Sequence, residues 1–390
     1  MRAAHLAALK DAVGIGGKAA VGEEHRFDAL PELFVRQEEK ARSPLRRRCL
    51  GHALSSLRSF AFGSQYVSLV DIPRAKHRFA PSAIFGLGAR LRIRNLDREA
   101  RMSGGYDDRD GKIWLDGQLV EWRDAQVHVL THALHYASSV FEGERCYDGR
   151  IFKGVEHSQR LRKSAELLDF EIPYSVEGIE TAKYAVLEAN GWSNAYVRAL
   201  AWRGAGPDMG VASLRNPVRM AVAAWEWGSY YGDAKMKGAK LDIAKWKRPS
   251  PETAPSQAKA AGLYMICTMS KHAAEAKGCS DALMFDYRGY VAERTGANMF
   301  FVKDGEVHTP LADCFLNGIT RQTVIAMLKD KGLTVHERHI MPEELEGFEQ
   351  CWLTGTAAEV TPVGQIGDYS FEVGALTRDV AESYEKLVRA

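Results

Sequence analysis

From residue 112 onward, apolar and polar positions follow one another in short alternating runs that are separated by turn signals. Asp116-Gly117 and Asp148-Gly149 each stand between two such runs, so we expect two hairpins. The spacing of Leu161, Ala165 and Leu168 places three apolar side chains on one face of a helix. These elements predict a small lobe that mixes strands and helices. Its other elements are expected to be helices at 158–168 and 176–190, the second ending at Gly191, and strands at 195–202 and 218–225.

After residue 256 the strand-like alternation and the helical spacing of apolar residues return, so a second and larger lobe is expected. Val324 and Leu328 belong to a strong helical pattern that stops at Gly332. Turn signals at Arg288-Gly289 and Asp304-Gly305 each separate two short strand-like runs. The expected helices lie at 264–278, 320–331 and 377–390, and the expected strands lie at 282–286, 290–292, 298–302, 306–309, 335–339 and 350–354.

Together these patterns predict an α+β fold of two lobes behind an N-terminal extension. The small lobe spans 102–232, a loop rich in Lys, Gly and Pro spans 233–256, and the large lobe spans 257–390. Residues 1–101 show no sustained hydrophobic period. We expect this extension to be disordered, or to be an artefact of the assigned start site, with the native protein beginning near Met102.

Charge separates the same two parts of the chain. Residues 1–101 contain 19 Lys and Arg against 10 Asp and Glu, whereas the whole chain carries a net charge of only +2. A basic arm of this kind can bind nucleic acid, but its charges are not interleaved with the aromatic residues that a stacking surface needs. We therefore expect no nucleic-acid partner. No run approaches the roughly 18 apolar residues of a membrane span, so we expect no membrane partner either.

Composition and cysteine spacing narrow the class of protein. Hydrophobic residues make up 46% of the chain and charged residues 26%, as in ordinary globular proteins. The six cysteines show no C-x-x-C spacing, which argues against a zinc site or a disulfide framework. We expect no bound metal, and a cytoplasmic location in which thiols stay reduced.

One lysine stands apart from the other charges of the chain. Lys259 is the only Asp, Glu, Lys or Arg between Glu252 and Lys271, and small residues surround it. With no counter-charge and with room for a flat ligand, its amine can lose a proton and act as a nucleophile, which Schiff-base chemistry requires. A surface lysine on a small-residue loop is the alternative that this segment alone leaves open.

Other residues would complete such a site. The glycine turn before the helix at 320–331 would present backbone N–H groups to a phosphate, and Thr356 follows a predicted strand among small residues. Glu293 stands near a strand end, where a carboxylate can keep a ring nitrogen protonated. Tyr196 and Arg198 lie two apart on one face of a strand, which suits a substrate carboxylate. Each feature has an alternative: an ordinary helix cap for the glycine turn, a solvated acid for Glu293, and a structural ion pair for Tyr196 and Arg198.

Taken together, these segments make the chain similar to the branched-chain amino acid aminotransferases, which are pyridoxal-phosphate enzymes of fold type IV. The resemblance runs from about Lys112 to the C-terminus. It implies a small N-terminal lobe, a larger barrel-like lobe and a homodimer. It rests on five strings in the same order, which are VHVLTHALHYASSVFEGER at 127–145, AYVR at 195–198, AKAAGLY at 258–264, GITR at 318–321 and GTAAE at 355–359.

The resemblance implies a role for each candidate. Lys259 would carry pyridoxal 5'-phosphate as an aldimine and shuttle protons, Glu293 would pair with the pyridine nitrogen, and Tyr264 would lie near the phenolic oxygen. The phosphate would be held by Arg160, Ile319, Thr320 and Thr356. The substrate carboxylate would be received by Tyr196, Arg198 and Ala357, and the substrate side chain would be surrounded by Tyr136, Phe141, Val211, Trp227, Tyr230 and Tyr264.

Two residues depart from the family's pattern. Arg294 follows Glu293 where the family usually has a small residue, and Ala297 stands where an acidic residue is common. A bulky cation directly after Glu293 would be able to change the geometry or the charge of that carboxylate.

The implied reaction is a ping-pong transamination of the branched-chain L-amino acids Leu, Ile and Val with 2-oxoglutarate, which gives 2-oxo acids and L-glutamate. D-amino-acid aminotransferase and aminodeoxychorismate lyase are alternatives of the same fold type, and the pair Tyr196 and Arg198 and the aromatic residues Trp227 and Tyr230 argue against them. A non-enzymatic binding protein with a basic tail is the alternative from a different class. The sequence does not rank Leu, Ile and Val as substrates.

Overall fold

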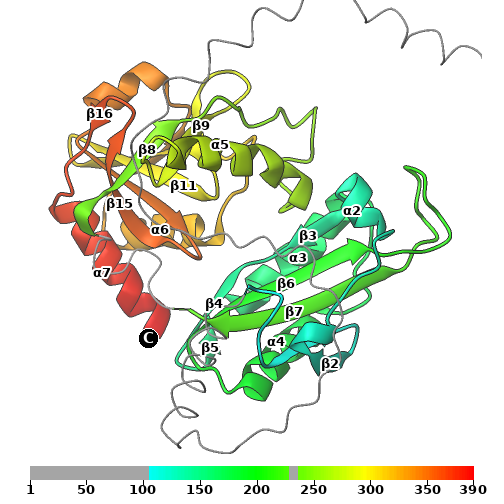
Figure 1. The fold of residues 1–390 in the computed structure, drawn as a ribbon. Helices are drawn as coiled ribbons and strands as arrows, with labels where there is room; N and C mark the ends of the chain where they lie inside the picture. Colours follow the sequence, from blue (N-terminus) through cyan, green and yellow to red (C-terminus); the bar gives the residue numbers. More distant parts are fainter. Residues whose placement is uncertain (1–104, 228–235) are drawn as a thin grey trace, which may run out of the picture. The chain divides into compact units, whose positions relative to one another are not determined.

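The structure, a computed structural model, describes residues 105–227 and 236–390 (Figure 1). The described residues all belong to one compact unit of the chain. The expectations for the extension 1–101 and for Tyr230 fall outside the described residues.

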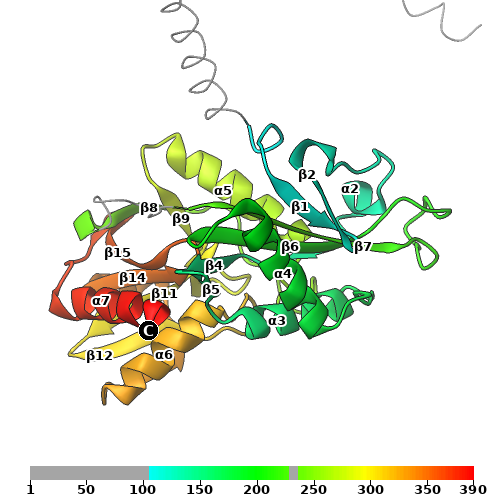
Figure 2. The same cartoon turned by 90° about the horizontal axis from the view of Figure 1, so that it is seen from below.

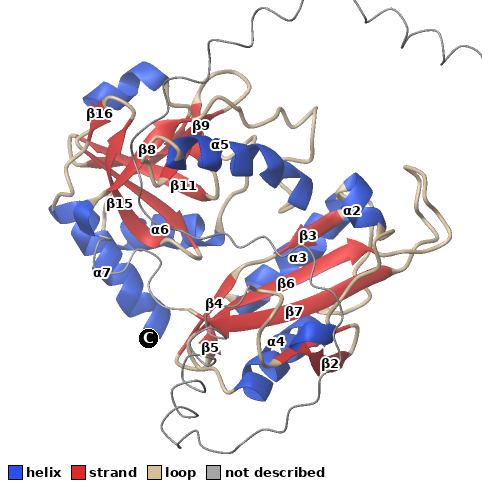
Figure 3. Cartoon of the chain, viewed as in Figure 1, coloured by secondary structure: helices blue, strands red, loops and turns tan. Residues whose placement is uncertain are grey.

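The first lobe is an antiparallel sheet with helices packed on it. The strands run in the order β2-β1-β7-β6-β4-β5, and β3 pairs with β6. Helices α3 and α4 contact β1, β6 and β7 and lie along one face of the sheet (Figures 2 and 3). The elements are β1 Lys112–Leu115, β2 Gln118–Glu121, α2 His132–Tyr136, β3 Ser139–Phe141, β4 Glu144–Tyr147, β5 Arg150–Ile151, α3 Gly154–Leu167, α4 Val176–Asn190, β6 Ala195–Arg203 and β7 Val218–Glu226.

Local sequence signals fix the ends of α4 where the sequence predicts them. The Ser175 side chain accepts a hydrogen bond from the backbone N–H of Gly178 at 3.1 Å, which caps the first turn. Gly191 ends the helix with φ of 68°, a left-handed conformation that glycine adopts without strain. Both expected hairpins are also confirmed, since β1 pairs with β2 and β4 pairs with β5.

The second lobe closes a ring of strands, as the expectation of a barrel-like lobe requires. Its sheet runs in the order β10-β9-β8-β15-β14-β11-β12-β13, and an additional pairing between β10 and β11 joins the ends of the first six strands. Helices α6 and α7 pack against β14, and α5 packs against β8 and β9. The elements are β8 Ala239–Ile243, α5 Met265–Glu275, β9 Asp281–Phe285, β10 Val291–Arg294, β11 Ala297–Lys303, β12 Glu306–Pro310, α6 Ile319–Asp330, β13 Val335–Arg338, β14 Gln350–Gly355, β15 Glu359–Ile366, β16 Tyr369–Ser370 and α7 Ala375–Arg389.

Two strands of this ring are absent from the sequence-based expectation. The segment expected to be a loop at 233–256 contains β8, which pairs in parallel with β9 and β15. Its single fully buried side chain, Leu241, stands between Lys240 and Asp242, so the segment has no apolar run to recognise. Strand β15 contains Pro362, a residue that usually marks loops or sheet edges. Both partners of β8 lie far away in the chain, whereas β15 pairs with the neighbouring strands β14 and β16 as well as with β8.

Helix α3 begins four residues before the expected start at Ser158. Its first turns carry His157 and Ser158, which are polar yet buried. Their partners are carboxylates on other elements, Glu142 for His157 and Glu180 for Ser158. Because polar residues rarely line a buried helix face, hydrophobic periodicity alone does not detect this turn.

Among the described residues, no helix is both long and apolar enough to cross a membrane. The expected cytoplasmic location stays a prediction.

Candidate active site

One cavity of the structure brings together all seven residues that the resemblance assigns to the cofactor. Glu293, Asn298 and the turn at Thr295 and Gly296 form part of the lining, and the start of α6 forms another part of it. The seven predicted residues in the lining are Arg160, Lys259, Tyr264, Glu293, Ile319, Thr320 and Thr356.

The backbone of Lys259 forms hydrogen bonds with two elements of the first lobe. Its N–H donates to Ser164 Oγ on α3 at 3.0 Å, and its carbonyl accepts a hydrogen bond from the N–H of Phe141 on β3 at 3.2 Å. The amine Nζ donates to the hydroxyl of Tyr264 at 2.8 Å and lies 4.8 Å from the centroid of the Phe141 ring. The amine therefore projects into the cavity, and no carboxylate forms an ion pair with it among the described residues.

Arg160 on α3 supplies a largely buried cation to the lining of this cavity. Its Nε and Nη2 donate to the two oxygens of Glu142 at 2.6 and 2.8 Å, and His157 Nδ1 lies 2.7 Å from the same carboxylate. Burial alone would raise the pKa of Glu142, but the charges of Arg160 and His157 outweigh burial and hold that pKa far below its usual range. The third nitrogen, Nη1, is buried and has no hydrogen-bond partner in the described part of the chain.

The start of α6 adds backbone donors to the same cavity. Gly318 is the residue before the helix, and no side chain caps the first turn. The N–H groups of a first helical turn point along the axis and favour an anion. Ile319 and Thr320 of this turn, together with Thr356 of the turn after β14, line the cavity. An anion at this place would meet a guanidinium, a helix N-terminus and a hydroxyl.

Glu293 supplies a buried carboxylate elsewhere in the lining. Its Oε2 accepts a hydrogen bond from Asn298 Nδ2 at 3.1 Å, and its Oε1 forms an ion pair with Arg248 Nε at 3.3 Å. Burial raises the pKa of Glu293 to about 7, against the opposing charges of Arg248 and Lys259. Arg248 is not among the residues predicted from the sequence, although it is the one arginine between the predicted end of the small lobe and Lys259.

The structure separates Arg294 from the carboxylate that it follows. Consecutive side chains of a strand point to opposite faces, and Arg294 Nε donates to Asp281 Oδ2 on β9 at 2.6 Å. Thr295 Oγ1 donates to the other oxygen of Asp281 at 2.6 Å. The cation that pairs with Glu293 is Arg248, from a different segment. The unusual Arg294 thus forms a buried ion pair of its own, and Ala297 lies in the wall of the cavity.

A row of aromatic and cationic side chains extends from Lys259 along β6. The Arg198 guanidinium lies 4.8 Å from the centroid of the Phe141 ring, and its Nη2 donates to the Tyr196 hydroxyl at 3.4 Å. The rings of Tyr196 and Trp227 lie 5.0 Å apart. Arg198 Nε is buried and has no hydrogen-bond partner among the described residues. Ala357 follows Thr356 in the turn after β14. The arrangement offers a carboxylate one guanidinium and one phenol.

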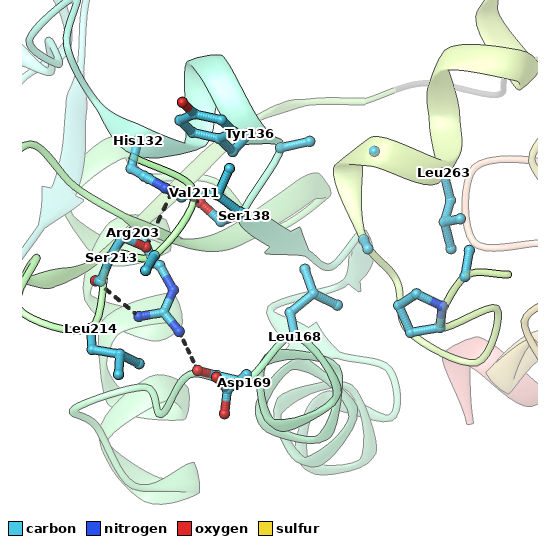
Figure 4. Close-up of a pocket in the computed structure, with 16 residues that line it drawn as sticks. His132, Tyr136, Ser138, Leu168, Asp169, Arg203, Val211, Ser213, Leu214 and Leu263 are labelled. Atoms are coloured by element: carbon cyan, nitrogen blue, oxygen red, sulfur yellow. Dashed lines mark hydrogen bonds between the residues drawn. The ribbon is translucent and has the colours of Figure 1, made fainter. Parts of the chain in front are cut away.

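Tyr136 and Val211 lie elsewhere. Both line a second cavity, shown in Figure 4, together with His132, Arg203 and Leu263. Tyr136 donates its hydroxyl to the carbonyl of Met209 at 3.3 Å, and Val211 is 80% exposed. Their predicted contact with the substrate side chain stays a prediction, and neither residue lines the cavity of Lys259.

Comparisons with known proteins agree with this geometry. The family described as "Amino-transferase class IV" matches residues 139–366. The probable branched-chain-amino-acid aminotransferase of Rickettsia felis is 41% identical over 287 residues, which covers 71% of this chain and 96% of that protein. The enzyme of Pseudomonas aeruginosa is 38% identical over 289 residues, covering 72% of this chain and 94% of that protein.

Solved structures give the same result. The T.th. branched-chain amino acid aminotransferase, solved with pyridoxamine 5'-phosphate, superposes with a TM-score of 0.70 at 40% identity, over 72% of this chain and 96% of that one. The branched-chain aminotransferase of Thermoproteus uzoniensis with norvaline gives 0.69 at 33% identity, over 72% and 95%. The chain therefore belongs to the class IV aminotransferases and, within them, to the branched-chain-amino-acid aminotransferases. The predicted enzyme class and fold type are confirmed.

Proposed function

We propose that this chain binds pyridoxal 5'-phosphate on Lys259 and transfers the amino group of L-leucine, L-isoleucine or L-valine to 2-oxoglutarate in two half-reactions. The observation that supports this most is the shared cavity, in which a lysine amine, a buried carboxylate and an anion cradle are brought together from both lobes. Relatives solved with pyridoxamine 5'-phosphate and with N-(5'-phosphopyridoxyl)-L-glutamate support the choice of cofactor.

The residues fit the cofactor at three points. The orphaned Nη1 of Arg160 and the uncapped first turn of α6 suit a phosphate dianion. Glu293 suits a protonated ring nitrogen, because a buried carboxylate gains a cationic partner there. Lys259 suits an aldehyde, since a neutral amine is the nucleophile that attacks one. When bound, the cofactor supplies an electron sink for the charge left when the substrate loses its α-proton.

The protein's own groups then bind the substrate and move protons. The substrate carboxylate would pair with Arg198 and the Tyr196 hydroxyl. Lys259 Nζ, held by the Tyr264 hydroxyl at 2.8 Å, would take the α-proton as a general base and return it as a general acid. The apolar rings of Phe141 and Trp227 would contact an aliphatic side chain of the substrate.

A substrate panel tests the proposed reaction. The purified protein should convert L-leucine, L-isoleucine and L-valine with 2-oxoglutarate, with glutamate as the measured product. D-alanine and aminodeoxychorismate are the matched comparisons, because they are the substrates of the two alternatives within the fold type. Turnover of either one in preference to the branched-chain L-amino acids would contradict the proposal.

The buried carboxylate predicts a pH dependence for cofactor binding. The pKa of Glu293 without cofactor is about 7, and the ring nitrogen pairs with the ionised form. The dissociation constant for pyridoxal 5'-phosphate should therefore rise as the pH falls below 7, by up to about tenfold per pH unit, because the pairing between Glu293 and the ring nitrogen is lost. Above pH 7 this pairing is kept. Titration of the cofactor-free protein between pH 5.5 and 8.5, a range of about three units around this pKa, measures the effect.

Glu293→Gln is the control for this pH dependence. The phosphate of the cofactor titrates in both proteins, so only the difference between the two profiles belongs to Glu293. Equal slopes in the wild type and in Glu293→Gln would show that Glu293 does not control binding.

We also propose a homodimer in which Tyr136 and Val211 of one copy complete the substrate pocket of the other. Both residues belong to an exposed apolar surface on the first lobe, where Leu134 is 64% and Leu214 is 77% exposed. Contiguous exposed apolar side chains of this kind are typical of protein interfaces.

Mixing two inactive variants tests this dimer. Lys259→Ala lacks the amine, and the double variant Tyr136→Ala with Val211→Asp lacks the completing side chains. If one copy completes the other's site, half of a randomly mixed population is mixed dimers with one intact site each, which gives about a quarter of the wild-type activity. If each chain is self-contained, the mixture should give only the mean of the two parent activities.

A further inference from the structure

Asn298 makes three side-chain hydrogen bonds in the cavity of Lys259. It lies on β11 and is only 3% exposed. Its Nδ2 donates to Glu293 Oε2 at 3.1 Å and to the carbonyl oxygen of Leu316 at 3.0 Å, and its Oδ1 accepts from the N–H of Gly318 at 3.1 Å. Both amide hydrogens and one oxygen lone pair are therefore used.

These partners belong to two different parts of the cavity. Glu293 lies opposite Asn298 in the register of β10 and β11 and is the proposed partner of the ring nitrogen. Leu316 and Gly318 belong to the turn that opens α6, where the phosphate would bind. One carboxamide thus connects the carboxylate that would pair with the ring nitrogen to the turn that would hold the phosphate.

The hydrogen bonds also fix the orientation of the carboxamide. The N–H of Gly318 is a donor, so the oxygen of Asn298 must face it, and the nitrogen must then face Glu293. An aspartate at this position would set a second buried carboxylate against Glu293, which is strongly unfavourable. The packing is close enough that a methyl group on Gly318 would overlap Asn298 Oδ1.

Arg248 makes this restraint necessary. Its guanidinium pairs with Oε1 of Glu293 at 3.3 Å and is itself buried. An arginine can bind both oxygens of a carboxylate at once. The amide of Asn298 holds Oε2 and opposes that arrangement, so that only Oε1 pairs with Arg248.

We propose that Asn298 is a positioning residue, which holds the Glu293 carboxylate and the phosphate-binding turn at the separation that pyridoxal 5'-phosphate requires. Asn298 acts through Glu293 and Gly318 and has no chemical step of its own. This inference rests on the proposed function, since it presupposes that the cavity binds this cofactor.

The test compares two asparagines with the same hydrogen-bond pattern. Asn190 also donates twice, to the carbonyl oxygens of Lys112 and Val186, and accepts once, from the N–H of Lys112, but it joins α4 to β1 in the first lobe. Asn298→Ala and Asn190→Ala are each freed of cofactor and titrated with pyridoxal 5'-phosphate. The dissociation constant should rise about 10- to 100-fold for Asn298→Ala, as expected for loss of buried hydrogen bonds to a charged group, and less than about threefold for Asn190→Ala.

A spectroscopic measurement separates positioning from general loosening of the fold. In Asn298→Ala the absorption band of the bound cofactor should shift relative to the wild type, because the pairing of the ring nitrogen changes, whereas in Asn190→Ala it should not. An unchanged band together with an unchanged dissociation constant in Asn298→Ala would overturn the inference.

Gly318→Ala supplies a second route if Asn298→Ala does not fold. The added methyl group displaces the Asn298 carboxamide while its side chain remains present, so cofactor affinity should again fall about tenfold or more. Wild-type affinity in Gly318→Ala would overturn the inference. The wild type is the reference for the proposed function. If the wild type binds no pyridoxal 5'-phosphate, the proposed function fails. If the wild type binds it and the variants bind it equally well, only the inference about Asn298 fails.

Discussion

Replacement of Lys259 by alanine is expected to lower kcat for transamination by at least about 10⁴-fold, because one amine serves as covalent anchor and as proton carrier. Its side chain makes one hydrogen bond, to Tyr264, and is half-buried. The fold should therefore keep its stability to within about 1 kcal/mol. Glutamate formation from L-leucine and 2-oxoglutarate measures the loss, and thermal unfolding of the cofactor-free protein checks the fold.

Tyr264→Phe is the graded control for Lys259→Ala. It removes the hydroxyl that accepts the hydrogen bond from Nζ but keeps the amine and the ring. Its kcat should fall by about 10-fold, within the range for one hydrogen bond of about 0.5–1.5 kcal/mol. Lys259→Ala with a kcat similar to that of Tyr264→Phe would show that another group carries the proton.

The largest effect on stability is expected at Glu142. This carboxylate is fully buried and holds Arg160 and His157 through hydrogen bonds of 2.6 to 2.8 Å. Glu142→Ala would leave a buried guanidinium without its counter-ion, which typically costs about 3–5 kcal/mol. The free energy of unfolding in urea should fall by that amount, and the affinity for pyridoxal 5'-phosphate should fall with it because Arg160 loses its fixed orientation.

Glu156 offers a matched comparison on the same helix as Arg160. It forms an ion pair with Lys153 at 2.8 Å, but both side chains are about half exposed. Exposed pairs of this kind contribute about 0–1 kcal/mol, so Glu156→Ala should change the free energy of unfolding by less than about 1 kcal/mol. If Glu142→Ala is no more destabilised than Glu156→Ala, the buried network does not support the phosphate end of the cavity.

The elements that the sequence predicts correctly are those whose signals are local. Helix α4 has a cap at Ser175 and a stop at Gly191, and both ends agree with the expectation. Strand β8 is different, because its five residues contain one fully buried side chain and its two neighbours lie about 40 and 120 positions away in the chain. Tertiary pairing creates this strand, and no local pattern marks it.

The same distinction applies to the site. Lys259 stands out because it is isolated from other charges, and Arg198 because it stands two residues from Tyr196 on a strand. Arg248 and Asn298 have no such signal in the sequence. Their place in the site comes from contacts with Glu293, which only the folded chain brings about. Arg294 gives the opposite case: the sequence places it next to Glu293, whereas the alternation of strand β10 directs it to Asp281.

The attachment of the cofactor to Lys259 is the central claim, and one measurement tests it directly. The protein is loaded with pyridoxal 5'-phosphate, reduced with borohydride and digested, and the labelled peptide is identified by mass spectrometry. If Lys259 carries the cofactor, the phosphopyridoxyl group should lie on Lys259 alone, and prior addition of L-leucine without 2-oxoglutarate should prevent the labelling. Label on another lysine, or no label in a protein that still transaminates L-leucine, would show that the cofactor is not attached to Lys259.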